Sequence, residues 1–191
     1  MDTRTMTGAE TFLRQLGAMG VERIFASPGS EWSPVWEHLA KPYESPHAIP
    51  EYRSTRHEET AIAMAMGYAK STGKLPAVMI HTTVGALHGA MAMRGALQEN
   101  VPMVIFAGES VGFGDAEGPD PGSQWMRSLA DVGGPARLAA PVVKWSFAVN
   151  AKSAFAGIVA RACQIATAAP QGPVFVSLPM ELLFDVVPDT A

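Results

Sequence analysis

The sequence predicts a doubly wound α/β domain, in which a parallel sheet is covered by helices on both faces. Short segments that are almost continuously apolar alternate with longer segments that carry helical signals. A strand without polar alternation indicates burial on both faces, which is typical of parallel sheets. No internal repeat or linker interrupts the 191 residues, which is an ordinary length for one domain. We therefore expect residues 1–191 to form a single domain.

The individual elements follow from the same patterns and from local end signals. Strands are expected at residues 21–26, 76–81, 102–107 and 172–178, with one more near 47–50. Helices are expected after Thr7 up to Gly20, and at residues 34–40, 58–71, 85–98, 124–132 and 151–168. Thr7 and Glu10 have the spacing of a capping box, and Gly73 is placed to end a helix. Residues 112–122, rich in Gly and acidic residues, are expected to form an exposed loop near the site.

Composition excludes several classes of protein. A net charge of −4 and the lack of a Lys/Arg run give no basis for binding nucleic acid. The N-terminus lacks the apolar core of a signal peptide, and no apolar run is long enough to span a membrane. The single cysteine, Cys163, cannot form an internal disulfide and is expected in the core. We expect a cytoplasmic protein.

Polar residues follow the predicted strands at the points where ligands bind to parallel sheets, beyond their carboxyl ends. The first strand is followed by Ser27-Pro28-Gly29-Ser30, and the third expected helix begins with Arg56-His57-Glu58-Glu59. Two later strands end at His81 and near Glu109. A hydroxyl, a pair of carboxylates and an imidazole would then gather at one edge. That edge is the expected ligand site.

Helical spacing distinguishes Glu58 from Glu59. Glu58 shares a face with Ile62, Ala65, Met66 and Ala69, whereas Glu59 lies on the flank nearer solvent. Burial disfavours a charged carboxylate, so Glu58 could share a proton with a ring nitrogen. The alternative is that both acids only stabilise the helix through its dipole, because they lie at its N-terminus, each by about 0.3–1 kcal/mol.

At these residues the chain resembles a known family. Several stretches resemble, in their order and spacing, the pyrimidine-binding (PYR) domain of thiamine-diphosphate enzymes. These stretches are Ile24–Ser30, Arg56–Glu59 with Ala65–Lys70, Val101–Glu109, Val143–Ser146 and Gly172–Pro179. The resemblance is to the acetolactate synthase, benzoylformate decarboxylase and pyruvate decarboxylase superfamily and covers nearly the whole chain. Lys144 and Trp145, within these stretches, are interpreted as structural.

The resemblance implies a cofactor and a reaction. Glu58 would hydrogen-bond N1′ of the aminopyrimidine of thiamine diphosphate and stabilise its imino tautomer, which removes the C2 proton. The expected substrate is a 2-keto acid, which is decarboxylated to an enamine that is then protonated or joined to a second carbonyl compound. Both outcomes remain open, since they share every earlier step.

The resemblance also assigns further site residues. Ser30 and His81 match the active-site serine and histidine of the benzoylformate decarboxylase branch, His81 as a proton relay. The alternatives are an N-cap for Ser30 and a structural histidine bonded to backbone for His81. The expected cofactor contacts besides Glu58 are Pro28, Gly85, Met103 and Glu109.

The chain also departs from the pattern of its relatives. Glu109 replaces a common Gln, and His88 stands where relatives often have Asn; we interpret His88 as a surface or interface residue. Glu59 receives no catalytic role. These departures affect the expected substrate more than the cofactor.

The part of the site that holds diphosphate and Mg²⁺ is not apparent. That part usually carries Gly-Asp-Gly and then Asn some two dozen residues later, but Gly114-Asp115 is followed by Ala116 and the next Asn is Asn150. We expect no metal site here and a second (PP-domain) β subunit that supplies Mg²⁺, in an α₂β₂ assembly like that of sulfopyruvate decarboxylase. Because the chain starts at Met1 and ends after a complete final strand, it need not be a truncated fragment. The alternative function is a non-catalytic regulatory subunit that keeps the PYR fold.

Overall fold

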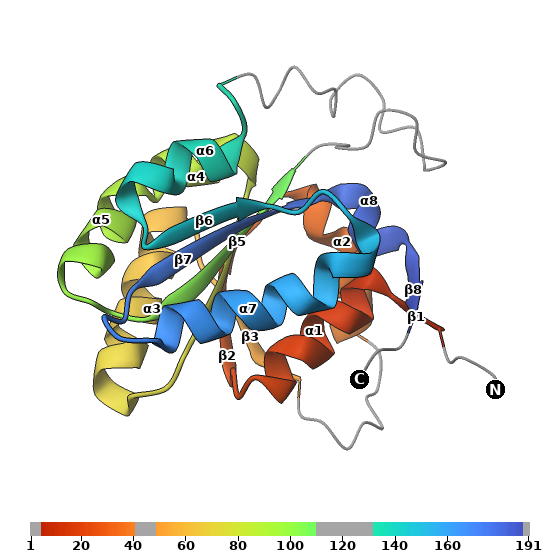
Figure 1. Cartoon of the computed structure of the whole chain (residues 1–191), viewed down its shortest axis with the longest axis horizontal. Helices are drawn as coiled ribbons and strands as arrows, with labels where there is room; N and C mark the ends of the chain where they lie inside the picture. The colour runs from red at the N-terminus through yellow and green to blue at the C-terminus, as the bar shows by residue number, and fades with distance from the viewer. Residues whose placement is uncertain (1–4, 41–48, 110–131, 189–191) are drawn as a thin grey trace.

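A six-stranded, wholly parallel sheet forms the centre of the protein (Figure 1). The structure, a computed structural model, describes residues 5–40, 49–109 and 132–188. In spatial order the strands are β3 (Glu51–Ser54), β2 (Arg23–Ser27), β4 (Ala77–Ile80), β5 (Met103–Glu109), β7 (Pro173–Pro179) and β6 (Trp145–Ala148). In register, Phe25 lies beside Val78, and Val78 beside Ile105.

Helices cover both faces of this sheet, each over its own apolar core (Figure 1). One face carries α1 (Gly8–Ala18), α2 (Ser33–Leu39) and α7 (Phe155–Thr167). The other carries α3 (Glu58–Thr72), α4 (Thr82–His88), α5 (Ala90–Gln98) and α6 (Pro135–Ala139). The predicted doubly wound α/β class is confirmed. No helix among the described residues is long and apolar enough to cross a membrane.

Aromatic packing fixes α1 and α7 on the first face. Phe12 of α1 meets Phe106 of β5 edge to face at 4.9 Å between ring centroids, and lies 6.4 Å from Phe155 of α7. Trp32, at the end of the short 3₁₀ helix η1 (Ser30–Trp32), is fully buried against the same ring. Cys163 is buried in this core, as predicted.

Two predicted helix ends are confirmed in detail. The Thr7 hydroxyl accepts a hydrogen bond from the Glu10 N–H at 3.1 Å, and Gly73 ends α3 in the left-handed region with φ of 70°. The Glu10 carboxylate does not complete the capping box; it pairs instead with Arg14 at 2.7 Å and lies 3.4 Å from Nε2 of His38.

The structure differs from the sequence prediction in several elements. The helix expected over 85–98 is divided into α4 and α5 at Gly89, where a Cβ would come within 2.4 Å of the Ile62 side chain. The edge strand is β3 at 51–54; residues 49 and 50 of the expected strand near 47–50 are not in a strand, and residues 47 and 48 lie outside the described ranges. Strand β6 was not expected. The antiparallel pair β1 (Thr5–Thr7) and β8 (Val186–Pro188) and the short helix α8 (Met180–Phe184) were not foreseen either.

Some expected segments lie outside the described residues. These are the loop at 112–122 and all of the helix at 124–132 except Val132, which lies in a turn.

Candidate functional site

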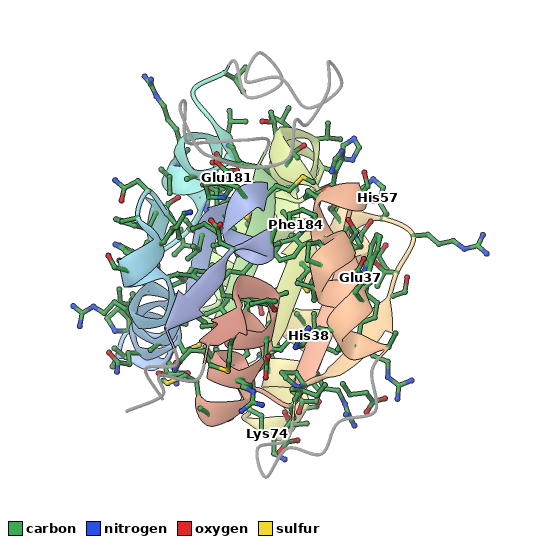
Figure 2. The ribbon with its side chains drawn as sticks, turned by 90° about the vertical axis from the view of Figure 1, so that its right-hand side faces the viewer. Glu37, His38, His57, Lys74, Glu181 and Phe184 are labelled. Carbon is green, nitrogen blue, oxygen red and sulfur yellow. The ribbon has the colours of Figure 1, made fainter. Side chains whose placement is uncertain are left out.

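The candidate site lies at the carboxyl ends of the strands. His57, before α3, and Glu181, after β7, lie at this end of the sheet, whereas Lys74, which precedes β4, lies at the opposite end (Figure 2). Glu58, one of the expected polar residues, follows β3 across a short turn.

Glu58 is the first residue of α3 and is 7% exposed. Ile62 and Ala65, on the same face of the helix, are fully buried, whereas Glu59 is exposed. The predicted orientation of the two glutamates is therefore confirmed. A carboxylate in such surroundings makes strong hydrogen bonds, because little water competes for its oxygens.

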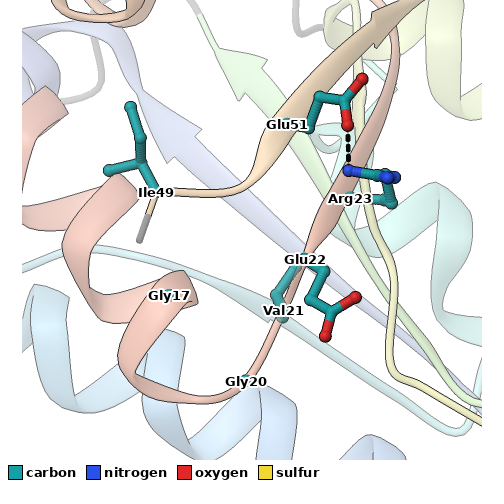
Figure 3. Close-up of a pocket in the computed structure, with 7 residues that line it drawn as sticks. All are labelled: Gly17, Gly20, Val21, Glu22, Arg23, Ile49 and Glu51. Atoms are coloured by element: carbon teal, nitrogen blue, oxygen red, sulfur yellow. Dashed lines mark ion pairs between the residues drawn. The ribbon is translucent and has the colours of Figure 1, made fainter. Parts of the chain in front are cut away.

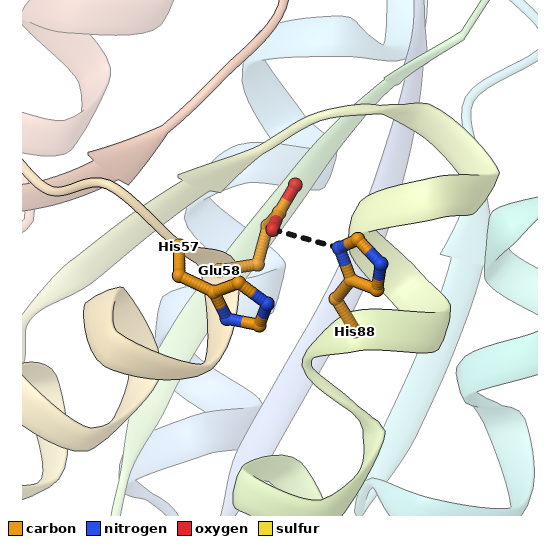
Figure 4. Close-up of side chains that lie close together, drawn as sticks. All are labelled: His57, Glu58 and His88. Atoms are coloured by element: carbon orange, nitrogen blue, oxygen red, sulfur yellow. Dashed lines mark hydrogen bonds and ion pairs between the residues drawn. The ribbon is translucent and has the colours of Figure 1, made fainter.

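His88, at the end of α4, is the hydrogen-bond partner that the structure gives this carboxylate. Its Nδ1 lies 3.1 Å from Oε2 of Glu58 (Figure 4). Helices α3 and α4 approach closely here because Gly85 has no side chain; a Cβ at that position would lie 3.3 Å from Cγ of Glu58. His88 is half exposed, so its predicted surface position is confirmed, but its contact with Glu58 was not foreseen.

His57 caps α3 beside this pair. Its Nδ1 accepts a hydrogen bond from the Glu59 N–H at 3.2 Å, so the neutral ring carries its proton on Nε2. The ring stacks on that of His88, with 4.9 Å between centroids and 21° between planes. No role was predicted for His57 from the sequence, although it belongs to the Arg-His-Glu-Glu motif.

His81 follows β4 and pairs with a buried acid. Its Nδ1 lies 2.9 Å from Oε2 of Glu31, a side chain with no exposed surface. The Glu31 hydrogen bond is the main reason that the pKa of His81 is raised above 6.5, against the opposing effect of burial; the charge of Glu58 raises it further. A carboxylate thus holds the His81 ring, and Glu58 is near enough to act on its charge.

Two glycines and a tryptophan fix the position of Glu31. A Cβ at Gly29 would fall 2.4 Å from Oε2 of Glu31, and one at Gly108 would fall 2.0 Å from its Cγ. Trp32, the next residue, donates its indole N–H to the carbonyl of Ile80 at 3.0 Å, which ties η1 to the end of β4. Thr82, directly after His81, has φ of 28°, a conformation that β-branched residues rarely adopt.

Glu31 is the functional candidate that sequence reasoning missed. It sits next to Ser30 at a strand exit, where no periodicity reveals which way a side chain points. The available signal was its place in the Pro-Gly-Ser-Glu-Trp run at a carboxyl end, combined with glycines that leave room for a large neighbour.

Ser30 and Pro28 lie at the same edge. Ser30 is exposed and is the first residue of η1; Gly29 is the N-cap, so Ser30 does not serve as one. Its carbonyl accepts a hydrogen bond from the Ser33 hydroxyl at 2.6 Å. Pro28 is partly buried between β2 and η1.

Of the remaining expected contacts, Glu109 is at this edge and Met103 is not. Glu109 ends β5; burial raises the pKa of its carboxyl, the charge of Glu181 adds to this, and the Ser177 hydroxyl opposes it. Met103 begins β5 and is fully buried at the other end of the strand, about 20 Å from Glu109 at 3.3 Å per residue. The structure therefore does not bring Met103 to Glu58. The resemblance indicated the correct strand, but Met103 lies at the end of that strand opposite to the candidate site.

A hollow of about 440 Å³ lies at that other end (Figure 3). It is lined by Gly17 near the end of α1, by Gly20 after that helix, by Val21–Arg23 at the start of β2, and by Ile49 and Glu51. None of the candidate residues contributes to it, and we assign it no function.

Comparison with known proteins gives this edge a context. Residues 6–112 match the family described as thiamine pyrophosphate enzyme, N-terminal TPP binding domain. The chain is 33% identical over 176 residues to the mitochondrial acetolactate synthase catalytic subunit of Aspergillus candidus, covering 92% of this chain and 23% of that protein. It is 30% identical over 182 residues to the acetolactate synthase large subunit of Buchnera aphidicola (Schizaphis graminum), covering 93% and 28%.

A solved structure shares the fold over almost the whole chain. Benzoylformate decarboxylase from Polynucleobacter necessarius superposes with a TM-score of 0.79 at 25% identity, covering 97% of this chain and 32% of that one. The present chain thus spans between about a quarter and a third of the length of these proteins.

Proposed function

The chain belongs to the thiamine pyrophosphate enzymes, as an N-terminal TPP binding domain, and from this premise we propose that it forms the aminopyrimidine-binding half of an enzyme that decarboxylates a 2-keto acid. The observation that carries the proposal is the buried carboxylate of Glu58 at the start of α3. A carboxylate is costly to bury, so a buried one at the strand exits marks a candidate ligand-binding position.

The residues present fit the aminopyrimidine of thiamine diphosphate. Glu58 has one carboxylate oxygen, Oε2, bonded to His88, and its other oxygen can meet a ring nitrogen. A Cβ at Gly85 would lie 3.3 Å from Cγ of Glu58, so the glycine keeps side-chain atoms away from this carboxylate. An aminopyrimidine needs an anchoring carboxylate of this kind.

In the proposed mechanism Glu58 holds a proton against the ring nitrogen of the bound cofactor. Its burial excludes water from that hydrogen bond, and the His88 contact fixes the direction of the carboxylate. Thiamine diphosphate, when bound, supplies the electron sink for decarboxylation. The chain's own contribution is orientation and the position of one proton.

His81 and Glu31 supply a second proton position. Because the Glu31 carboxylate accepts from Nδ1, the Nε2 atom of His81 becomes the nitrogen that exchanges a proton with substrate. The raised pKa keeps the ring protonated to higher pH, which suits a donor to the decarboxylated product. The exposed Ser30 hydroxyl, at the same edge, is proposed to bind the substrate carboxylate.

A second polypeptide is proposed to hold the diphosphate and Mg²⁺. The 191 residues contain no Gly-Asp-Gly segment followed by Asn at the usual spacing. The helix that carries His88 also exposes Val84 and Leu87, and α5 exposes 75% of Met91. An apolar surface beside the site supports an interface there, and we propose an α₂β₂ assembly in the cytoplasm.

Activity in a reconstituted pair tests the proposal. This chain is co-expressed with a candidate partner that carries the Gly-Asp-Gly…Asn segment, and CO₂ release is measured on a panel of 2-keto acids with and without thiamine diphosphate and Mg²⁺. Glu58→Gln should lower turnover by about 10²- to 10⁴-fold, the range for a positioned acid–base group. Glu59→Gln is the matched control, because it removes an exposed carboxylate from the same helical turn.

The outcomes separate the alternatives. Activity of the pair alone, lost in Glu58→Gln and kept in Glu59→Gln, supports the two-component enzyme, and the products distinguish decarboxylation from carboligation. Formation of a complex that neither binds the cofactor nor turns over any keto acid would favour a regulatory subunit instead. Full turnover by the chain without a partner would contradict the proposed division of the site.

A further inference from the structure

Three side chains from two helices lie together at the entrance to the carboxyl edge. His57 precedes α3, Glu58 begins it, and His88 ends α4. One ligand atom from each residue can be chosen so that all three lie within 4.8 Å of one another (Figure 4). The cluster depends on the close approach of α3 and α4, which Gly85 and Gly89 permit.

The cluster combines a buried acid with two accessible imidazoles. The Glu58 side chain is 10% exposed and the His88 side chain is 50% exposed, and His57 is also at the surface. Oε2 of Glu58 already lies 3.1 Å from Nδ1 of His88, so two of the three groups are held together before any ligand arrives. Water therefore reaches the cluster from the imidazole side.

Two imidazoles and one carboxylate form a ligand set for a transition-metal ion. Zn²⁺ binds such N and O donors at about 2.0–2.2 Å and accepts a water or other ligand in a fourth position. Mg²⁺ prefers oxygen ligands throughout, so this set does not suit it. We propose that His57, Glu58 and His88 form a binding site for a divalent transition-metal ion of the Zn²⁺ class.

A modest rearrangement completes the site. Ligand atoms around a tetrahedral Zn²⁺ are about 3.3 Å apart, so the separations within the cluster, which are at most 4.8 Å, must shorten by up to about 1.5 Å. His57 must also give up the hydrogen bond from the Glu59 N–H, since a neutral ring cannot bind a metal through Nε2 and still accept a hydrogen bond at Nδ1. Loss of a cap of this kind weakens a helix only slightly compared with the strength of metal coordination.

The ion and the cofactor would compete. Glu58 is a ligand in this site and is also the carboxylate that the proposed function assigns to the aminopyrimidine, so a bound ion would exclude the ring. This consequence rests on the proposed function, whereas the ion site itself does not.

Metal titration of the tag-free chain tests the site. Co²⁺ serves as the probe because its visible absorption reports coordination by nitrogen and oxygen, and Zn²⁺ is then measured by competition. We expect saturable binding of one ion per chain. His88→Asn and His57→Asn should each weaken Co²⁺ binding by at least about tenfold. Loss of a residue that only supports a ligand already weakens metal binding by roughly 10- to 100-fold, and these two residues are proposed as ligands themselves.

The two variants are chosen so that the fold persists. Asn at position 57 can still cap α3, and Asn at 88 can still donate to Glu58. His38→Asn is the matched control, since it removes another imidazole that lies near a glutamate, in α2 on the other face of the sheet, and it should leave Co²⁺ affinity unchanged. Equal affinity in the wild type and both ligand variants, or no saturable binding, would overturn the proposal.

A competition arm separates this inference from the proposed function. Thiamine, which has the aminopyrimidine but no diphosphate to chelate metal, is added to the assembled complex during the Co²⁺ titration. Weaker apparent Co²⁺ binding would support shared use of Glu58. Unchanged Co²⁺ affinity at saturating thiamine would contradict that sharing, while binding that depends on His57 and His88 would still support the ion site.

Discussion

Nδ1 of His81 lies 2.9 Å from Oε2 of Glu31, a fully buried carboxylate 50 residues earlier in the chain. The pair joins the exit of β2 to the exit of β4, which are neighbours in the sheet. It gives the candidate site a histidine whose proton is held by a defined partner. Several measurable properties of the protein depend on contacts of this kind.

Glu31→Gln should lower the pKa of His81. The hydrogen bond to Glu31 raises that pKa above 6.5 in the folded chain. The stabilisation that this bond gives is therefore complete below about pH 6.5 and is lost as the pH rises through the pKa of His81 in the folded chain. Chemical denaturation should show the variant to be less stable by on the order of 1 kcal/mol in the acid range, with the difference shrinking as the pH rises.

NMR titration of the His81 ring checks the same variant directly. Glu59→Gln is the control, because it removes a carboxylate that the structure does not pair with His81. A His81 pKa that is the same in the wild type and Glu31→Gln would show that the pair has no electrostatic effect.

Gly108→Ala should destabilise the fold through the same pair. The new Cβ would lie 2.0 Å from Cγ of Glu31, and the fully buried side chain has little room to shift. We expect a loss of about 1–3 kcal/mol in thermal or urea unfolding. Gly67→Ala, on the exposed side of α3 with nothing within 4 Å, is the control and should be neutral or stabilising by up to about 1 kcal/mol. A neutral Gly108→Ala would contradict the described packing of Glu31.

Glu109→Gln should stabilise the chain at neutral pH. Burial and the charge of Glu181 raise the pKa of Glu109 above 4.5, so the fold disfavours its ionised form and stability falls as the pH rises past that value. The gain from the substitution should therefore appear at pH 7 and vanish below pH 4. Urea unfolding at both pH values measures it, and equal effects at the two would contradict the assignment.

Lys144→Met should destabilise the end of α7. The ammonium group donates to the carbonyls of Ile165 and Ala168, in the last turn of that helix and just beyond it. We expect a loss of about 1.5–3 kcal/mol, as for hydrogen bonds that involve a charged group. Lys70→Met, which removes an exposed pair with Glu99, is the control and should cost less than about 1 kcal/mol. Hydrogen exchange at the C-terminal amides of α7 should speed up only in Lys144→Met.

The sequence by itself determined the fold class and the orientation of Glu58. Apolar runs alternating with helices leave few arrangements other than a parallel sheet with two covered faces. Helical periodicity placed Glu58 on the face of Ile62 and Ala65 because those residues lie on one helix, where spacing decides direction. The order of its motifs also indicated the family.

Only the tertiary structure decided which distant residues meet. Glu31 and His81 are brought together by strand adjacency, and His88 reaches Glu58 because Gly85 and Gly89 let α4 approach α3. No local pattern encodes such contacts, since each depends on the packing of two elements rather than on the period of one. For the same reason sequence similarity placed Met103 in the site, whereas the direction of β5 places it at the far end of the sheet.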